Sequence, residues 1–169
     1  MKVMLKNVRL SFPSLFKTEV YAGEDTGKYA ATFLINKSDT KTVTAIEQAC
    51  KAALVEKYGE GKVPKGFKMP LVDGDDKEYQ GYADCVCIKA NTKKRPTLVN
   101  RDKTPIVEED GILYGGCYVN ASIDVWVMDN PYGKKVLASL NAIQFVKDGE
   151  AFGSKSEGAD DFEDLDDEF

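Results

Sequence analysis

Alternating apolar and polar residues predict five β-strands in this chain, because successive side chains of a strand point to opposite faces of a sheet. The predicted strands span residues 3–12, 28–36, 82–91, 117–128 and 135–146. Pro13 ends the first strand, because proline lacks the N–H group that a sheet ladder needs. The turn sequence Asp129–Gly133 joins the last two strands in a predicted hairpin. In the first strand the alternation places on one face Met4, Lys6, Val8, Leu10 and Phe12.

A repeat of apolar residues at spacings of three and four predicts one helix between the second and third strands. The repeat consists of Val43, Ile46, Cys50, Ala53 and Leu54. Ser38 or Asp39 is the expected N-cap, and Gly59 is the expected end. From Gly59 to Glu78, four glycines, two prolines and an acidic cluster predict a long irregular loop. Loops of this length in small domains are usually functional or mobile.

Five strands and one helix predict a mainly β fold. Antiparallel strands in this number suit a small closed or nearly closed barrel of the OB-fold type, which buries one face and leaves the other open to a ligand. The helix here follows the second strand, earlier than its usual position between the third and fourth strands of that fold. We expect one domain over residues 1–153, since 169 residues with 43% hydrophobic content suffice for a single core.

The composition is that of a soluble protein that is not exported. No apolar run approaches the roughly 20 residues needed to cross a bilayer, and Lys2 and Lys6 interrupt the N-terminus too early for a signal peptide. The four cysteines form no CxxC pair, which favours reduced thiols in a cytoplasmic protein.

The charge is unevenly distributed along the chain. Residues 154–169 contain eight acidic side chains and one lysine, a balance of −7. The remaining 22 basic and 20 acidic side chains give residues 1–153 a balance of +2. We therefore expect a faintly basic domain followed by a disordered acidic C-terminal tail over residues 154–169.

The common catalytic and metal-binding signatures are absent from the sequence. There is no histidine, Walker loop or GxSxG motif. Asp73, Asp75 and Asp76 are of the type that holds magnesium in nucleases, although acidic surface loops are far more common. Zinc bound by all four cysteines is a weaker alternative, because free cysteines are mostly small core residues. We expect a binding protein with no catalytic residue, metal or cofactor.

A basic segment near two aromatic residues predicts nucleic-acid binding. Lysine and arginine attract phosphates, and a ring on a polar strand face is free to stack on a base. The alternatives are a solvated basic turn and a tryptophan covered by a loop or by the helix. The candidate DNA-binding residues are Lys89, Asn91, Lys93, Lys94, Arg95, Arg101, Lys103, Tyr118 and Trp126.

The acidic tail contains three apolar residues at spacings of three and four, Phe162, Leu165 and Phe169. A tail that serves only solubility, which is the alternative, does not need them. We interpret them as anchors for a pocket in a partner protein, with the acidic residues facing a basic rim.

Several segments, taken in order, resemble the OB-fold single-stranded-DNA-binding proteins of tailed bacteriophages and prophages. The matching segments are Val8–Phe12 with Leu15 and Phe16, Lys28–Ile35, Asn91–Pro96, Tyr114–Tyr118, Leu140–Gln144 and Gly149–Gly153. The resemblance covers nearly the whole chain and implies an OB-fold and a role in phage DNA replication or recombination.

The resemblance also extends to the tail. In bacterial and phage proteins of this kind, an acidic end with a terminal phenylalanine recruits replication partners and competes with DNA. That role carries over to Asp166, Asp167, Glu168 and Phe169. The expected partners are single-stranded DNA and replication or recombination proteins in the cytoplasm of a bacterial host, with no membrane. Self-association stays open, as do two rival functions, an OB-like protein-interaction module and a metal-dependent nuclease or annealing protein.

Overall fold

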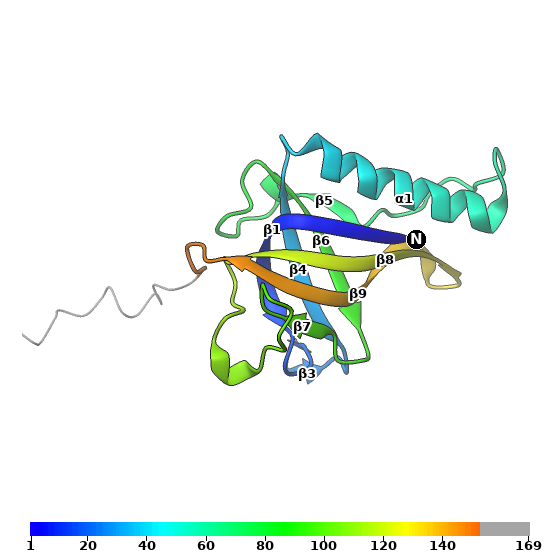
Figure 1. Cartoon of the computed structure of the whole chain (residues 1–169). Helices are drawn as coiled ribbons and strands as arrows, with labels where there is room; N and C mark the ends of the chain where they lie inside the picture. Colours follow the sequence, from blue (N-terminus) through cyan, green and yellow to red (C-terminus); the bar gives the residue numbers. More distant parts are fainter. Residues whose placement is uncertain (153–169) are drawn as a thin grey trace, which may run out of the picture.

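The computed structural model describes residues 1–152 and shows a β-barrel with one long helix packed against it (Figure 1). The helix α1 (Thr40–Tyr58) follows the second long strand, as expected. The five long strands are β1 (Lys2–Ser14), β4 (Tyr29–Asn36), β6 (Cys85–Thr92), β8 (Tyr118–Asn130) and β9 (Gly133–Lys147). The predicted strands and helix are confirmed, with boundaries that differ by three residues or fewer.

Pairing between neighbouring strands closes the barrel in the order β1, β4, β6, β9, β8 and back to β1. Four of these five pairings are antiparallel, while β6 and β9 pair in parallel at Asn91 and Ser139. Parallel and antiparallel strands show the same period of two, so the alternation alone does not reveal the parallel closure. A five-stranded barrel of this kind is the OB-fold architecture, which confirms the expected fold class.

Four short strands accompany the barrel. They are β2 (Val20–Tyr21), β3 (Glu24–Asp25), β5 (Leu71–Asp73) and β7 (Thr97–Val99), with 3-10 turns at Gly74–Asp76 and Glu108–Asp110. β2 and β3 pair with each other, β5 pairs with β6, and β7 pairs with β9. The predicted loop over residues 59–78 is therefore not irregular throughout. Its strand was missed because three residues are too few to show a period.

Inward-facing side chains of the strands and one face of α1 fill the barrel. Among the largest fully buried side chains are Phe33, Leu10, Ile88, Ile123 and, from α1, Ile46. Asp39 caps the helix by accepting a hydrogen bond from the backbone N–H of Thr42 at 3.3 Å, and Gly59, with φ of 96°, ends it. Within residues 1–152, no helix is both long enough and apolar enough to span a membrane.

A bulge interrupts the alternation of β1. Asn7 has a φ of 52°, and the pairing with β8 shifts register between Leu5 and Val8. Both Leu5 and Val8 are buried as a result, whereas Met4 is 52% exposed. The predicted face that joined Met4 to Val8 is therefore wrong, because a bulge moves the alternation by one residue.

The third long strand begins later than predicted. Asp84 adopts a φ of 58°, a left-handed conformation that an extended strand cannot include. The strand therefore starts at Cys85 rather than at Tyr82. Tyr82 belongs to the preceding loop and is buried, with 3% of its surface exposed.

Candidate nucleic-acid interface

A groove crosses the outer face of β4 and β6, the second and third long strands of the barrel. It combines a hollow of about 600 Å³ with an adjoining one of about 430 Å³. The two hollows share Phe12, Pro13, Tyr79 and Tyr82, and the larger has Thr32, Cys87 and Lys89 as its floor. The β2–β3 segment forms one wall and residues 70–79 contribute the other. We call this the β4–β6 groove; in OB-folds the corresponding face binds oligonucleotides and oligosaccharides.

Three aromatic rings gather where the two hollows meet. The ring centroids of Phe12 and Tyr79 lie 5.0 Å apart in a T-shaped arrangement, and those of Tyr79 and Tyr82 lie 5.2 Å apart. Phe12 and Tyr79 are each 55% exposed, whereas Tyr82 is buried. The two outer rings therefore rest on a buried one and offer apolar surface to a ligand.

The buried ring of this cluster is fixed by a hydrogen bond inside the protein. The hydroxyl oxygen of Tyr82 lies 2.8 Å from Oγ of Ser11, which is itself only 1% exposed. Burial raises the pKa of Tyr82 above its ordinary value. Tyr82 thus stays protonated at neutral pH and serves as a rigid support for the exposed rings.

Phe12 reaches the groove through an irregularity of β1. Its φ of 46° is a left-handed conformation that bulky residues rarely adopt. The pairing of β1 with β4 shifts register at this point, between Ser11 and Ser14. Strained backbone of this kind clusters at functional sites, where the surrounding structure holds it in place.

Lys89 provides a positive charge in the groove. Its side chain stands opposite Thr32 on the outer face of the β4–β6 pair and is 50% exposed. Its Nζ atom lies 2.9 Å from Oε1 of Glu19, on the β2–β3 wall. Of the nine residues predicted to bind DNA, Lys89 is the one that lines the groove.

The rest of the predicted basic segment borders this region. Lys93, Lys94 and Arg95 are exposed in the turn between β6 and β7. Nη2 of Arg95 donates to the carbonyl of Phe16 at 3.3 Å, which joins the turn to the chain leading into β2. Asn91, two residues beyond Lys89 on β6, is half-buried.

Arg101 and Lys103 lie farther along, in an exposed turn after β7. Gln144 of β9 donates to the carbonyl of Arg101 at 3.2 Å, which fixes the backbone of this turn to the barrel. In the described part of the chain, neither side chain forms an ion pair, so both charges are available to an anion.

The two aromatic residues predicted to stack on bases occupy different places on β8. Tyr118 is half-buried, with Lys147 Nζ 4.8 Å and Arg9 Cζ 5.7 Å from its ring centroid. Trp126 is 42% exposed and lines a separate hollow against α1. Trp126 lies eight positions after Tyr118 on the strand, about 26 Å at the usual rise. The structure does not bring Trp126 to the β4–β6 groove, and its stacking on DNA stays a prediction.

Sequence reasoning did not place Tyr79 in the site, and it placed Phe12 only on one face of the first strand. Tyr79 lies in a loop where neither strand nor helix periodicity identifies an exposed side chain. The only signal in the sequence is the segment Tyr79-Gln80-Gly81-Tyr82, where a glycine near two tyrosines indicates a turn. In the structure Gly81 has a φ of 83°.

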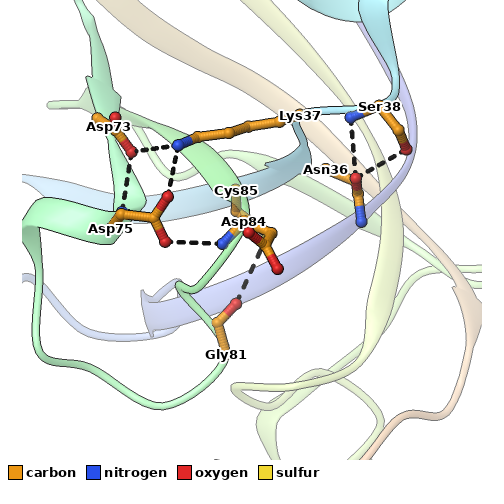
Figure 2. A network of polar contacts seen from close by, with 8 residues as sticks. All are labelled: Asn36, Lys37, Ser38, Asp73, Asp75, Gly81, Asp84 and Cys85. Atoms are coloured by element: carbon orange, nitrogen blue, oxygen red, sulfur yellow. Dashed lines mark hydrogen bonds and ion pairs between the residues drawn. The ribbon is translucent and has the colours of Figure 1, made fainter.

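An ion-pair network holds the loop that carries Tyr79 (Figure 2). Nζ of Lys37, the residue after β4, lies 2.8 Å from Oδ1 of Asp73 and 2.5 Å from Oδ2 of Asp75. The other carboxylate oxygen of Asp75 accepts from the backbone N–H of Asp84 at 2.9 Å. The network joins the beginning and the end of the loop to β4.

These contacts bear on the magnesium hypothesis. Hydrogen bonds from Lys37 lower the pKa of Asp73 and of Asp75, and the same contacts raise the pKa of Lys37. The carboxylates thus hold a lysine ammonium group. Over residues 1–152, no cluster of three or more acidic or cysteine side chains is arranged to bind a metal ion.

The four cysteines do not gather into a zinc site either. Cys50 and Cys117 are buried in the main core, and Cys87 lies on the outer face of β6 beside Cys85. Burial raises the pKa of Cys50 to about 11, so this thiol is protonated at neutral pH. The structure places all four as free thiols.

The described chain ends beside the groove. Phe152 lines the smaller hollow, and its ring centroid lies 4.3 Å from the guanidinium carbon of Arg9. Arg9 also donates to the carbonyl oxygens of Gly116 at 3.0 Å and Glu150 at 2.7 Å. The predicted tail residues lie outside the described residues, as does the predicted domain boundary at residue 153. Those tail residues are Phe162, Leu165, Asp166, Asp167, Glu168 and Phe169.

Comparison with known proteins gives consistent results. A family model described as "Enterobacter phage Enc34, ssDNA-binding protein" matches residues 1–169. The putative protein p50 of Acyrthosiphon pisum secondary endosymbiont phage 1 is 40% identical over 174 residues, which cover 98% of this chain and 94% of that protein.

Solved structures agree with these matches. The single-stranded DNA-binding protein from bacteriophage Enc34 in complex with ssDNA is 28% identical with a TM-score of 0.77, over 90% of this chain and 89% of that one. The gp2.5 protein of bacteriophage T7 is 16% identical with a TM-score of 0.63, over 97% and 96% of the two chains, and supports the fold alone.

Proposed function

The chain belongs to the family of the Enterobacter phage Enc34 single-stranded-DNA-binding protein, and on this basis we propose that it binds single-stranded DNA in the β4–β6 groove. Binding is independent of sequence and serves phage DNA replication or recombination in the cytoplasm of the bacterial host. The proposal describes a binding protein without catalytic activity. The observation that carries it is the pair of exposed rings, Phe12 and Tyr79, beside Lys89 in one groove.

The chemistry of the groove suits a single strand of any sequence. Every base has an aromatic face that can stack on Phe12 or Tyr79, and each such stack contributes about 1–3 kcal/mol. Lys89 and the basic turn attract the phosphates, which carry no sequence information. The cations proposed to contact phosphates are Lys89, Lys93, Lys94, Arg95, Arg101 and Lys103, with Asn91 beside them.

The acidic tail is proposed to regulate this groove. Phe152, two residues before the tail, lies at the groove. Its balance of −7 makes it a competitor for the same cations. Phe162, Leu165 and Phe169 are proposed to anchor replication or recombination proteins. DNA that occupies the groove would leave the tail available to them.

Substitution of the exposed rings tests the proposal. Phe12→Ala and Tyr79→Ala are each expected to weaken binding of a fluorescent oligo-dT strand by about fivefold or more, since each removes one stacking contact. Tyr132→Ala is the matched control, because Tyr132 is 91% exposed in the β8–β9 turn and does not line the groove. Trp126→Ala is expected to have a smaller effect than either groove variant.

Fluorescence anisotropy over a range of salt concentrations measures these effects. Wild-type affinity should fall as salt rises, because each neutralised phosphate releases counterions. If Phe12→Ala and Tyr79→Ala bind like wild type while Trp126→Ala does not, the binding site lies on the β8 face and the proposal is wrong.

A further inference from the structure

Lys89, on the floor of the larger hollow of the β4–β6 groove, is already paired with a carboxylate. The side chain of Glu19, only 21% exposed, forms its ion pair with Lys89 at 2.9 Å. Both residues line the larger hollow. A phosphate that approaches Lys89 therefore competes with this carboxylate for the ammonium group.

Glu19 belongs to a ribbon of residues 17–28 that is held together by its own hydrogen bonds. The backbone N–H of Glu19 donates to the carbonyl of Lys28 at 2.7 Å, and the carbonyl of Glu19 accepts from the N–H of Thr26 at 2.8 Å. Oγ1 of Thr18 donates to the carboxylate of Asp25 at 2.9 Å, which joins the two sides of the ribbon. The ribbon can therefore keep its structure if the Glu19 side chain changes partner.

One ion pair links this ribbon to the floor of the groove. In the described structure, the other hydrogen bonds of residues 17–28 all lie within those residues. Val20 and Tyr21, in the same ribbon, are 64% and 74% exposed, so apolar burial adds little to its attachment. The contact between Glu19 and Lys89 is thus the main polar link that DNA would need to break.

We propose that Glu19 is an intramolecular competitor that fills the phosphate position on Lys89 and is displaced by a bound single strand. This inference rests on the proposed function and concerns the regulation of the same groove. A carboxylate and a phosphate oxygen accept the same hydrogen bonds from an ammonium group, and their negative charges repel each other when both approach it. Binding therefore exchanges the Glu19–Lys89 pair for a phosphate–Lys89 pair and releases the ribbon.

The exchange favours a polymer over a single anion. A lone anion at Lys89 gains one ion pair and breaks another, so its net gain is small. A strand makes further phosphate contacts and stacks bases on Phe12 and Tyr79 at the same time. Glu19 thereby sets affinity and specificity although it does not contact the bound DNA.

Neutralising Glu19 tests the proposal with a matched control on the same ribbon. Glu19→Gln removes the competing charge and keeps the side-chain shape. Glu24→Gln removes the same charge from an exposed residue whose side chain forms no hydrogen bond or ion pair within residues 1–152. Binding of fluorescent oligo-dT to the full-length chains is measured by anisotropy at low and high salt.

Glu19→Gln is expected to tighten binding by about two- to fivefold at low salt, the effect of one surface ion pair. The gain should shrink at high salt, because screening also weakens the Glu19–Lys89 pair in wild type. Glu24→Gln should change affinity little. In a Lys89→Gln background the Glu19 substitution should have no further effect, because the shared cation is gone.

Three results would overturn the competitor role. Weaker binding by Glu19→Gln would show that Glu19 positions Lys89 for DNA, and equal tightening by both glutamine variants would show only a net-charge effect. If wild type binds DNA and Glu19→Gln binds equally well, the competitor role fails while the proposed function stands. If wild type does not bind single strands at all, the proposed function itself fails.

Discussion

Phe12 occupies a backbone conformation that is unfavourable for its residue type, and it exposes its ring there. A φ of 46° brings the β-carbon close to the backbone, at a cost of roughly 1–2 kcal/mol for an L-residue. With 55% of its surface exposed, the ring gains only part of the free energy that full burial would provide. A bulky residue in a strained, exposed position is explained if its ring contacts a ligand rather than the core.

Two substitutions at this position separate strain from stacking. Phe12→Gly should be more stable than Phe12→Ala by about 0.5–1 kcal/mol, because glycine adopts positive φ without a steric penalty. Both should weaken DNA binding, since both lack the ring. Urea denaturation compares their free energies of unfolding. An alanine variant as stable as the glycine variant would show that the conformation is not strained.

At the scale of elements, residues 70–79 contribute one wall of the groove, and an ion-pair attachment beside β4 adds to the pairing of β5 with β6 in holding them. Lys37 makes that attachment through Asp73 and Asp75. The carboxylate pKa values are lowered in the folded protein, so their contribution is complete above the ordinary value of 3.8 and is lost as pH falls through the lowered values. The pKa of Lys37 is raised, so its contribution is complete below 10.5 and is lost as pH rises beyond the raised value.

Lys37→Met is therefore expected to lower both stability and DNA affinity, because it loosens the loop that carries Tyr79. The stability difference from wild type should be constant between about pH 5 and pH 9 and decrease toward pH 2. Lys41→Met on α1 is the matched control, since Lys41 is exposed and forms no ion pair in residues 1–152. Thermal unfolding across this pH range measures the difference. If the stability difference between Lys37→Met and wild type stays unchanged at pH 2, it does not come from the ion pairs of Lys37 with Asp73 and Asp75.

The elements that could be predicted from sequence are those long enough to repeat a period. The five long strands and α1 were predictable on this ground, and the cap residue type narrowed the N-cap to Ser38 or Asp39, of which the structure shows Asp39. The bulge at Asn7, the three-residue strand β5 and the left-handed Asp84 were not, because each depends on tertiary pairing. Tyr79 was missed for the same reason, since its exposure is set by the loop and by the ring of Tyr82.

For the whole molecule, the arrangement of charge matters more than its total. The sequence predicted a basic segment, and the structure places Lys89 from it in the groove and the turn of Lys93–Arg95 beside the β2–β3 ribbon. The alternating pattern of β8 puts Trp126 on a polar strand face. It does not show which loop or helix lies beside that face, so the position of Trp126 relative to the groove could not be predicted. The described chain ends beside the groove at Phe152, two residues before the tail, so domain and tail are proposed to act on one surface.

The most direct test of this account is photo-cross-linking of the full-length chain to an oligo-dT strand that carries 5-iodouracil. The cross-linked residues are then identified by mass spectrometry. Cross-links are expected at Phe12 and Tyr79, with a higher yield at low salt in a chain that ends at Gly153, because the competing acidic tail is absent. Cross-links at Trp126 or Tyr132 in place of these two residues would contradict it.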